Sequence, residues 1–258
     1  MSDLENDKDL AIFGEEDNIK PIDLGGPAAG KAPARADVLP PIIDPDSRKP
    51  GAIPIKSDKP REPNAILKGD YLDLLDKNPT MRQICIAAGW EQRTIDEVKI
   101  DVDLSCFLLD KTGQTRNDED FVFYNNEKAI EGAVKHMGDS RTGAGDGDDE
   151  VVFIDLQGIP FDVIKVMIVL SIYDDEHTKK NFGMLRDMYV RIVNNENDDE
   201  IMRFTIEDDL VRGFNGFLSL CLVREGPKWF VECVGNASRD GLAAIAKGYG
   251  IIVKEQTG

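Results

Sequence analysis

Val166-Met167-Ile168-Val169-Leu170-Ser171-Ile172 is a short apolar run followed closely by the acidic residues Asp174-Asp175-Glu176. Short apolar runs bounded by turn residues are typical of β-strands. From about Asn64 onward the chain contains eight more such runs, and no long helix is predicted between them. Nine strands at this spacing predict an all-β fold, a sandwich of two antiparallel sheets.

The other eight predicted strands are residues 84–88, 104–109, 121–124, 151–154, 188–193, 201–204, 217–223 and 229–234. Two short helices are also predicted, one from Asp175 to about Asn181 and one over residues 241–247 that ends at Gly248. The acidic segment 194–199 joins two adjacent strands, so we expect it to be a solvated hairpin turn.

The composition restricts the class of protein. The chain has 258 residues, of which 41% are hydrophobic, and this is enough for a proper core. Its formal charge of -18 argues against unassisted nucleic-acid binding and favours divalent cations or basic partners. The sequence contains neither a run of about 18 apolar residues nor a basic, apolar leader at its start. We therefore expect a cytoplasmic protein without membrane insertion.

The cysteines and histidines give no sign of a zinc site. The four cysteines stand far apart in apolar contexts without CxxC spacing, which predicts buried free thiols; they are Cys85, Cys106, Cys221 and Cys233. The two histidines, His136 and His177, lie in polar stretches. We expect them at the surface, without a catalytic role.

The first 63 residues differ in composition from the rest of the chain. They are dense in proline, glycine and charge, and they lack sustained apolar periodicity. This predicts a disordered acidic tail over residues 1–63 and a single domain over residues 64–258. Such a tail buries too little apolar surface to offset the entropy of ordering it, so its deletion is expected to leave the stability of the domain nearly unchanged.

A glycine-rich acidic loop follows at Gly138-Asp139-Ser140-Arg141-Thr142-Gly143-Ala144-Gly145-Asp146-Gly147-Asp148-Asp149-Glu150. Its carboxylates repel one another unless a cation lies among them. Ca²⁺ takes roughly 6 to 8 oxygen ligands in a flexible geometry, which this loop can supply, whereas a phosphate would be repelled. The alternative is an acidic, solvated turn between strands.

Oxygen ligands also stand at the ends of three predicted strands. Asp101 and Asp103 are two residues apart, so their side chains project to the same face of an extended chain. Asn125 and Asn126 follow one strand with neutral amide oxygens, and Asp174 follows another. Each group alone is a weak signal, but their occurrence together with the glycine-rich loop is more specific.

These segments, taken together, resemble one known family. The segments that carry the resemblance are Asp101-Val102-Asp103-Leu104-Ser105, residues 118–126, residues 138–150 and Asn181-Phe182-Gly183. They are similar to the TerD family of tellurium-resistance and stress proteins, in register from about Leu67 to Lys254. The resemblance implies a two-sheet β-sandwich that binds calcium at loops clustered on one end, has a role in resistance to tellurite and other stresses, and has no enzymatic activity. Family members commonly begin near the first strand, so the acidic tail is a departure.

The leading hypothesis is therefore a calcium-binding, non-enzymatic stress protein that acts as a sensor or scaffold. The predicted ligands are Asp101, Asp103, Asn125, Asn126, Asp139, Asp148, Asp149 and Glu150, with Asp146 and Asp174 at the periphery. Removing the charge of Asp103 or Asp148 is expected to weaken Ca²⁺ binding and to leave the metal-free fold intact or slightly more stable. No EF-hand spacing is present, so the site must be assembled from several loops.

Two alternatives from other classes remain. One is a metal-dependent hydrolase, although the sequence shows no histidine or lysine with a clear role as general base. The other is a structural component of a larger assembly, in which calcium stiffens the fold. Protein partners are expected to contact the tail or to be other stress proteins.

Overall fold

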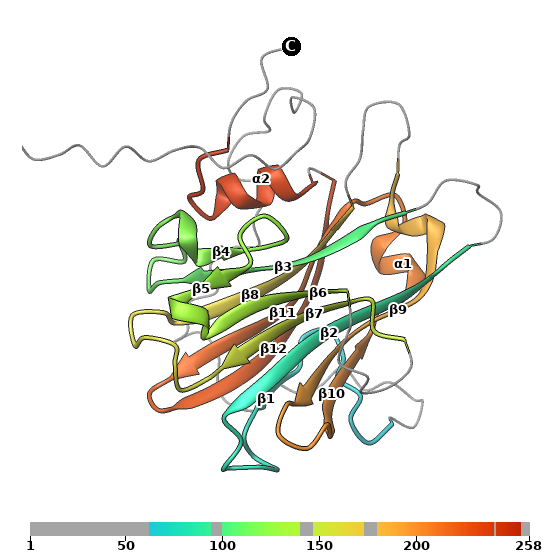
Figure 1. Cartoon of the computed structure of the whole chain (residues 1–258). Coiled ribbons are helices and arrows are strands. Elements are labelled where there is room, and N and C mark those ends of the chain that lie inside the picture. Colours follow the sequence, from blue (N-terminus) through green and yellow to red (C-terminus); the bar gives the residue numbers. More distant parts are fainter. Residues whose placement is uncertain (1–61, 94–99, 140–146, 173–179, 240, 254–258) are drawn as a thin grey trace, which may run out of the picture.

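The computed structural model describes residues 62–93, 100–139, 147–172, 180–239 and 241–253. Within these residues two six-stranded sheets pack face to face (Figure 1). One sheet has the order β1-β12-β11-β8-β3-β4 and the other has the order β10-β9-β2-β7-β6-β5, and all the paired strands of both sheets are antiparallel.

The strands are β1 Tyr71–Asp73, β2 Gln83–Gln92, β3 Val102–Leu109, β4 Phe121–Val122, β5 Lys128–Ala129, β6 Val134–Asp139, β7 Glu150–Asp155, β8 Lys165–Ile172, β9 Leu185–Asn194, β10 Glu200–Thr205, β11 Gly216–Glu225 and β12 Lys228–Ser238. The helices are α1 Asp208–Val211 and α2 Gly241–Gly248, with 3-10 turns at η2 Asp118–Asp120, η3 Ile130–Gly132 and η4 Phe182–Met184.

Successive side chains of each strand point to opposite faces of the sheet, which explains how one face of each sheet packs on a common core. On β3, for example, Leu104 and Cys106 point into the main core between the sheets, and Phe107 joins a second apolar cluster. That second cluster also contains Ile245 and Ala246 of α2, so the helix covers this outer face of the sheet. The predicted all-β sandwich is confirmed.

The nine predicted strands are all present, and the helix predicted over residues 241–247 corresponds to α2. The turn between β9 and β10 and the four buried free cysteines are also confirmed. Three strands, β1, β5 and β6, and the short helix α1 were missed. Most of the helix predicted from Asp175 falls at residues 173–179, outside the described residues. No helix in the described part of the chain has the length and apolar character needed to cross a bilayer.

The first described residues bind the open edges of both sheets. The Ile66 amide donates to the Arg203 carbonyl at 2.9 Å, and the Arg203 amide donates to the Asn64 carbonyl at 2.8 Å, which covers part of the β10 edge. A few residues later β1 pairs with β12 of the other sheet. The segment from Asn64 to Asp73 therefore belongs to the folded domain.

Two truncations test this boundary. Deleting residues 1–63 is expected to change the free energy of unfolding by less than about 0.5 kcal/mol, within the range of surface changes. Deleting residues 1–70 also removes the buried Ile66 side chain and is expected to cost about 3 kcal/mol. Urea unfolding of the two variants and the full chain measures both values. Equal losses in the two truncations would contradict the boundary.

Candidate calcium site

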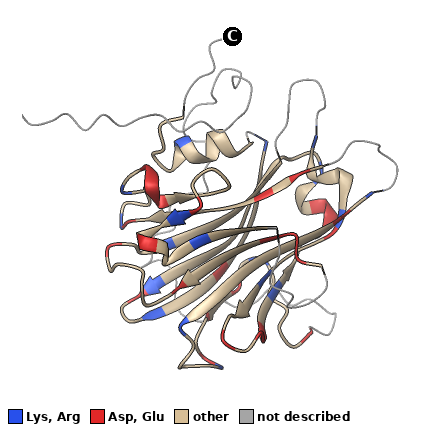
Figure 2. Ribbon diagram, in the orientation of Figure 1, with Lys and Arg blue, Asp and Glu red and all other residues tan. Residues whose placement is uncertain are grey.

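Acidic residues of both sheets lie near the start of β3, and near the place where the end of β6 pairs with the start of β7. Asp101 precedes β3 and Asp103 lies in it, while Asp139 and Glu150 occupy opposite positions in the β6–β7 register. The charges of Asp101 and Glu150 both act on Asp103. The structure thus places Asp101 and Glu150, which come from different sheets, close enough to Asp103 for their charges to act on it. Figure 2 shows that acidic residues are otherwise spread over turns and strand ends.

Asp103 is the most perturbed carboxyl group at this site. Burial, together with the negative charges of Asp101 and Glu150, raises its pKa from the usual 3.8 to about 6, against an opposing contribution from His136. In addition, Oε2 of Glu150 is buried and lies 2.9 Å from Nε2 of the His136 side chain. A divalent cation would relieve the repulsion among these carboxylates, and hard carboxylate oxygens are the donors that Ca²⁺ prefers.

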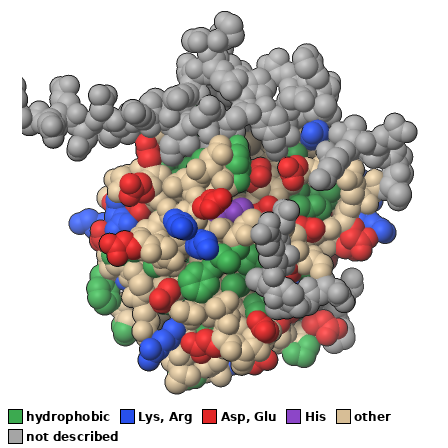
Figure 3. Space-filling model, in the orientation of Figure 1, with side chains coloured by type: hydrophobic (Ala, Val, Ile, Leu, Met, Phe, Trp, Pro, Cys, Tyr) green, Lys and Arg blue, Asp and Glu red, His purple; other side chains and the backbone are tan. Residues whose placement is uncertain are grey.

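The prediction that His136 lies at the surface is wrong. Its side chain is buried, and its Nε2 lies 2.9 Å from Oε2 of Glu150, as an ion pair without hydrogen-bond geometry. The Gly138 amide donates to its Nδ1 at 3.1 Å. Burial lowers the pKa of His136, but the Glu150 carboxylate and the Leu104 carbonyl outweigh it, so the net pKa is raised. Figure 3 shows a histidine side chain among acidic ones on this face. His177 lies outside the described residues.

Asp149 is attached to the neighbouring strand β2. Its Oδ2 accepts a hydrogen bond from the Trp90 amide at 2.9 Å, and its own amide donates to the Ala88 carbonyl at 2.8 Å. These bonds hold the chain at the start of β7.

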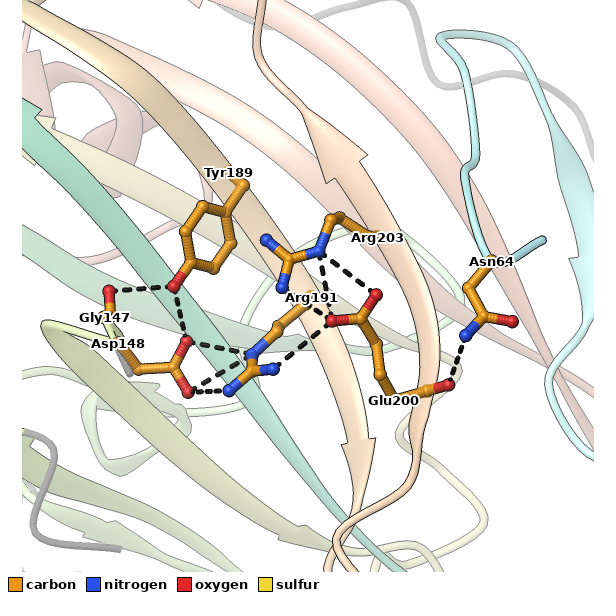
Figure 4. A network of polar contacts seen from close by, with 7 residues as sticks. All are labelled: Asn64, Gly147, Asp148, Tyr189, Arg191, Glu200 and Arg203. Carbon is orange, nitrogen blue, oxygen red and sulfur yellow. Dashed lines mark hydrogen bonds and ion pairs between the residues drawn. The ribbon is translucent and has the colours of Figure 1, made fainter. Parts of the chain in front are cut away.

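Asp148 has different surroundings from the other candidates (Figure 4). Arg191 binds it with both arms of the guanidinium, from Nε to Oδ1 at 2.9 Å and from Nη2 to Oδ2 at 2.5 Å. The Tyr189 hydroxyl lies 2.8 Å from both Asp148 Oδ1 and the Gly147 carbonyl, to one of which it donates its proton. Burial and the neighbouring Asp148 raise the pKa of Tyr189 to about 12, so the hydroxyl remains a donor at neutral pH.

The same network continues to the beginning of the domain. Nη1 of Arg191 lies 3.3 Å from the Glu200 carboxylate, which also binds Arg203 at 2.6 Å. The side-chain amide of Asn64 donates to the Glu200 carbonyl at 2.7 Å. Contacts between neighbouring residues therefore run from Gly147 to Asn64 across β9 and β10 (Figure 4).

The predicted amide ligands lie in the turn after β4. Asn126 donates from its side chain to the Phe121 carbonyl at 2.7 Å, which stabilises its own turn, and Asn125 is exposed in the same turn. Asp146, Asp174 and the side chain of Asp139 lie outside the described residues. Among the side chains that the structure does describe, no three His, Cys, Asp or Glu residues converge on a common point where a metal ion would be held.

The sequence did not predict a role for Tyr189 or Arg191. The available signal is their place in an apolar strand: Arg191 stands between Val190 and Ile192, so it shares the outer face of β9 with Tyr189. An arginine with an apolar residue on either side in a chain of -18 net charge suggests a carboxylate partner. Which of 49 acidic residues it meets depends on strand pairing, which the local pattern does not reveal.

Comparison with known proteins identifies relatives of this chain. A sequence model of the TerD domain matches residues 64–249. Tellurium resistance protein TerD of Alcaligenes sp is 37% identical over 187 residues, which cover 72% of this chain and 97% of that protein. General stress protein 16U of Bacillus subtilis is 35% identical over 190 residues, which cover 73% of this chain and 98% of that protein.

A solved structure agrees at the level of the fold. It is a homologue of telluride resistance protein (TerD) from Streptomyces coelicolor A3(2), with a TM-score of 0.51 and 16% identity. The match covers 65% of this chain and 98% of that one. The solved structure shows the same fold, and the matches in sequence show that this chain belongs to the TerD family.

Proposed function

We propose that this chain is a calcium-binding, non-enzymatic protein of the stress response associated with tellurite resistance, and that it acts as a sensor or scaffold. The observation that supports the calcium proposal is that Asp101 and Glu150, from two sheets, lie close enough to Asp103 for their charges to act on it, and that the pKa of Asp103 is raised. The similarity to relatives that are named as tellurium resistance and general stress proteins supports the cellular role.

The proposed ion is held by carboxylates of β3 and by the acidic loop that leads into β7. Asp101, Asp103, Asp149 and Glu150 are the described candidates, and Asp139, Asp146 and Asp174 complete the proposed acidic set. Asn125 and Asn126 add neutral oxygens from the turn after β4. A bound Ca²⁺ supplies positive charge that joins two sheets at their common end, so binding and folding are coupled.

We also propose that protein partners contact the acidic tail. The tail is rich in charge and proline, and a segment of this kind suits reversible contacts with basic surfaces. Capture experiments with the full chain and with a variant lacking residues 1–63 test this. Equal capture of the same proteins by both forms would contradict it.

Calcium is expected to stabilise the domain, because the ion binds the folded form and relieves carboxylate repulsion. At a Ca²⁺ concentration 100 times the dissociation constant, one site adds about 2.7 kcal/mol to the free energy of unfolding. Calorimetric titration of chelator-treated protein with Ca²⁺ and Mg²⁺ measures the affinities. We expect Mg²⁺ to compete poorly, since it demands a small octahedral shell and gives up water reluctantly. An unchanged melting temperature between chelator and millimolar Ca²⁺ would refute calcium binding.

A further inference from the structure

The contacts of Asp148 differ in kind from those of the other acidic candidates. Its side chain is only 4% exposed, and both of its oxygens accept hydrogen bonds from the side chain of Arg191, which is itself 13% exposed. Two-armed pairing of a carboxylate with arginine fixes orientation as well as position. The carboxylate is thus held by protein donors, whereas a calcium ligand needs an oxygen directed at the ion.

We propose that Tyr189 and Arg191 form a clamp on Gly147 and Asp148 that positions the next two residues, Asp149 and Glu150, for calcium binding, with Asp148 as a positioning residue and not a ligand. This inference rests on the calcium binding proposed above. The clamp is defined by these four residues, two on β9 and two at the end of the loop (Figure 4).

The two halves of the clamp meet over β2, the strand that lies between them. β2 pairs with both β7 and β9, and Gly89 of β2 lies opposite Tyr189. A Cβ atom at Gly89 would lie 2.4 Å from both the Gly147 carbonyl oxygen and the Tyr189 hydroxyl. Only glycine at position 89 leaves room for the Gly147 carbonyl and the Tyr189 hydroxyl to approach each other over β2.

The clamp is next to two candidate ligands in the sequence, so it helps to fix the position of their backbone. Asp149 and Glu150 follow Asp148 directly, and Asp149 is bonded to the backbone of β2 as described above. The peptide units that carry these two carboxylates are therefore fixed on one side by Arg191 and on the other by β2. Partners behind metal ligands typically change metal affinity by about 10–100-fold when they are removed.

Removal of Arg191 can either raise or lower the affinity for Ca²⁺. The direction distinguishes this proposal from the simpler one, in which Asp148 is itself a ligand. If Asp148 binds the ion, removing Arg191 frees its carboxylate and takes a positive charge away from a cation site, so affinity for Ca²⁺ rises. If Arg191 positions the loop, removing it disorders the ligands and affinity falls. Arg191→Gln distinguishes the two outcomes in one measurement.

We expect Arg191→Gln to raise the Kd for Ca²⁺ about 10–100-fold, measured by calorimetry well below the melting temperature of each variant. Arg186→Gln is the charge-matched control, since Arg186 lies on the same strand in an exposed ion pair with Glu91. Its Kd should stay within about twofold of the wild-type value. An unchanged or lowered Kd in Arg191→Gln would overturn the proposal.

A double-mutant cycle gives a second, independent measurement. Asp148→Asn alone, Arg191→Gln alone and the double variant should weaken Ca²⁺ binding by similar factors, because each removes the same clamp. Opposite effects of the two single variants would show that Asp148 is a ligand. If Arg191→Gln does not fold, Arg191→Lys and Tyr189→Phe retain most of the packing and should still raise the Kd. Wild-type protein that binds no Ca²⁺ would instead refute the proposed function itself.

Discussion

Asp148→Ala is expected to lower the free energy of unfolding of the metal-free protein by about 3 kcal/mol. The substitution leaves the Arg191 guanidinium largely buried and removes its two-armed carboxylate partner, while the Glu200 carboxylate remains at 3.3 Å. Removing one partner of a buried ion pair costs about 3–5 kcal/mol, and the remaining contact with Glu200 places this case at the lower end. Denaturant unfolding in the presence of chelator measures the loss.

This result would reverse the expectation from the sequence, in which Asp148 only repels its acidic neighbours. Asp101→Ala is the matched control because it also removes one carboxylate from the same end of the sandwich, but Asp101 is exposed. Its metal-free stability should change by less than about 0.5 kcal/mol or rise slightly. Equal effects of the two substitutions would mean that the pair with Arg191 contributes nothing to the fold.

The fold was predictable because most strands carry their signal locally. Runs such as residues 166–172 are apolar throughout, and their number and spacing are enough to predict a sandwich. β1 and β5 were missed because they have only three and two residues. β6 was missed because polar residues occupy it: His136 takes an inward position where the pattern would require an apolar side chain.

The sequence predicted which types of residue form the candidate site, but it did not predict which residues contact one another. The sequence alone indicated that Asp101, Asp103 and Glu150 could share an ion; in the structure the charges of Asp101 and Glu150 act on Asp103, and the shared ion stays a prediction. The sequence could not show that Asp148 is paired with Arg191, because the two residues are 43 positions apart and meet only through the pairing of β7, β2 and β9. Charge density is a local property, whereas the partner of each charge depends on the fold.

The stability of the metal-free protein is expected to fall as the pH rises from about 4 to above 6, through the titration of Asp103. Its pKa of about 6 in the folded state exceeds the usual 3.8, so the folded form keeps a proton that the unfolded chain has already released. Below both pKa values Asp103 is neutral in either state and has no effect. Above both, ionisation of the buried carboxyl costs the fold about 3 kcal/mol, since each pKa unit corresponds to about 1.4 kcal/mol.

Asp103→Asn isolates this effect, because it keeps the size of the side chain and cannot ionise. The variant should be about as stable as the wild type at pH 4 and about 3 kcal/mol more stable at pH 8 in chelator. His136 is present in both proteins, so its own titration contributes to both curves. Saturating Ca²⁺ should remove most of the difference at pH 8, because the ion stabilises the ionised carboxylate that the variant lacks. Parallel stability curves for the two proteins between pH 4 and pH 8 would show that Asp103 ionises at its ordinary pKa and that the carboxylates near it do not repel one another.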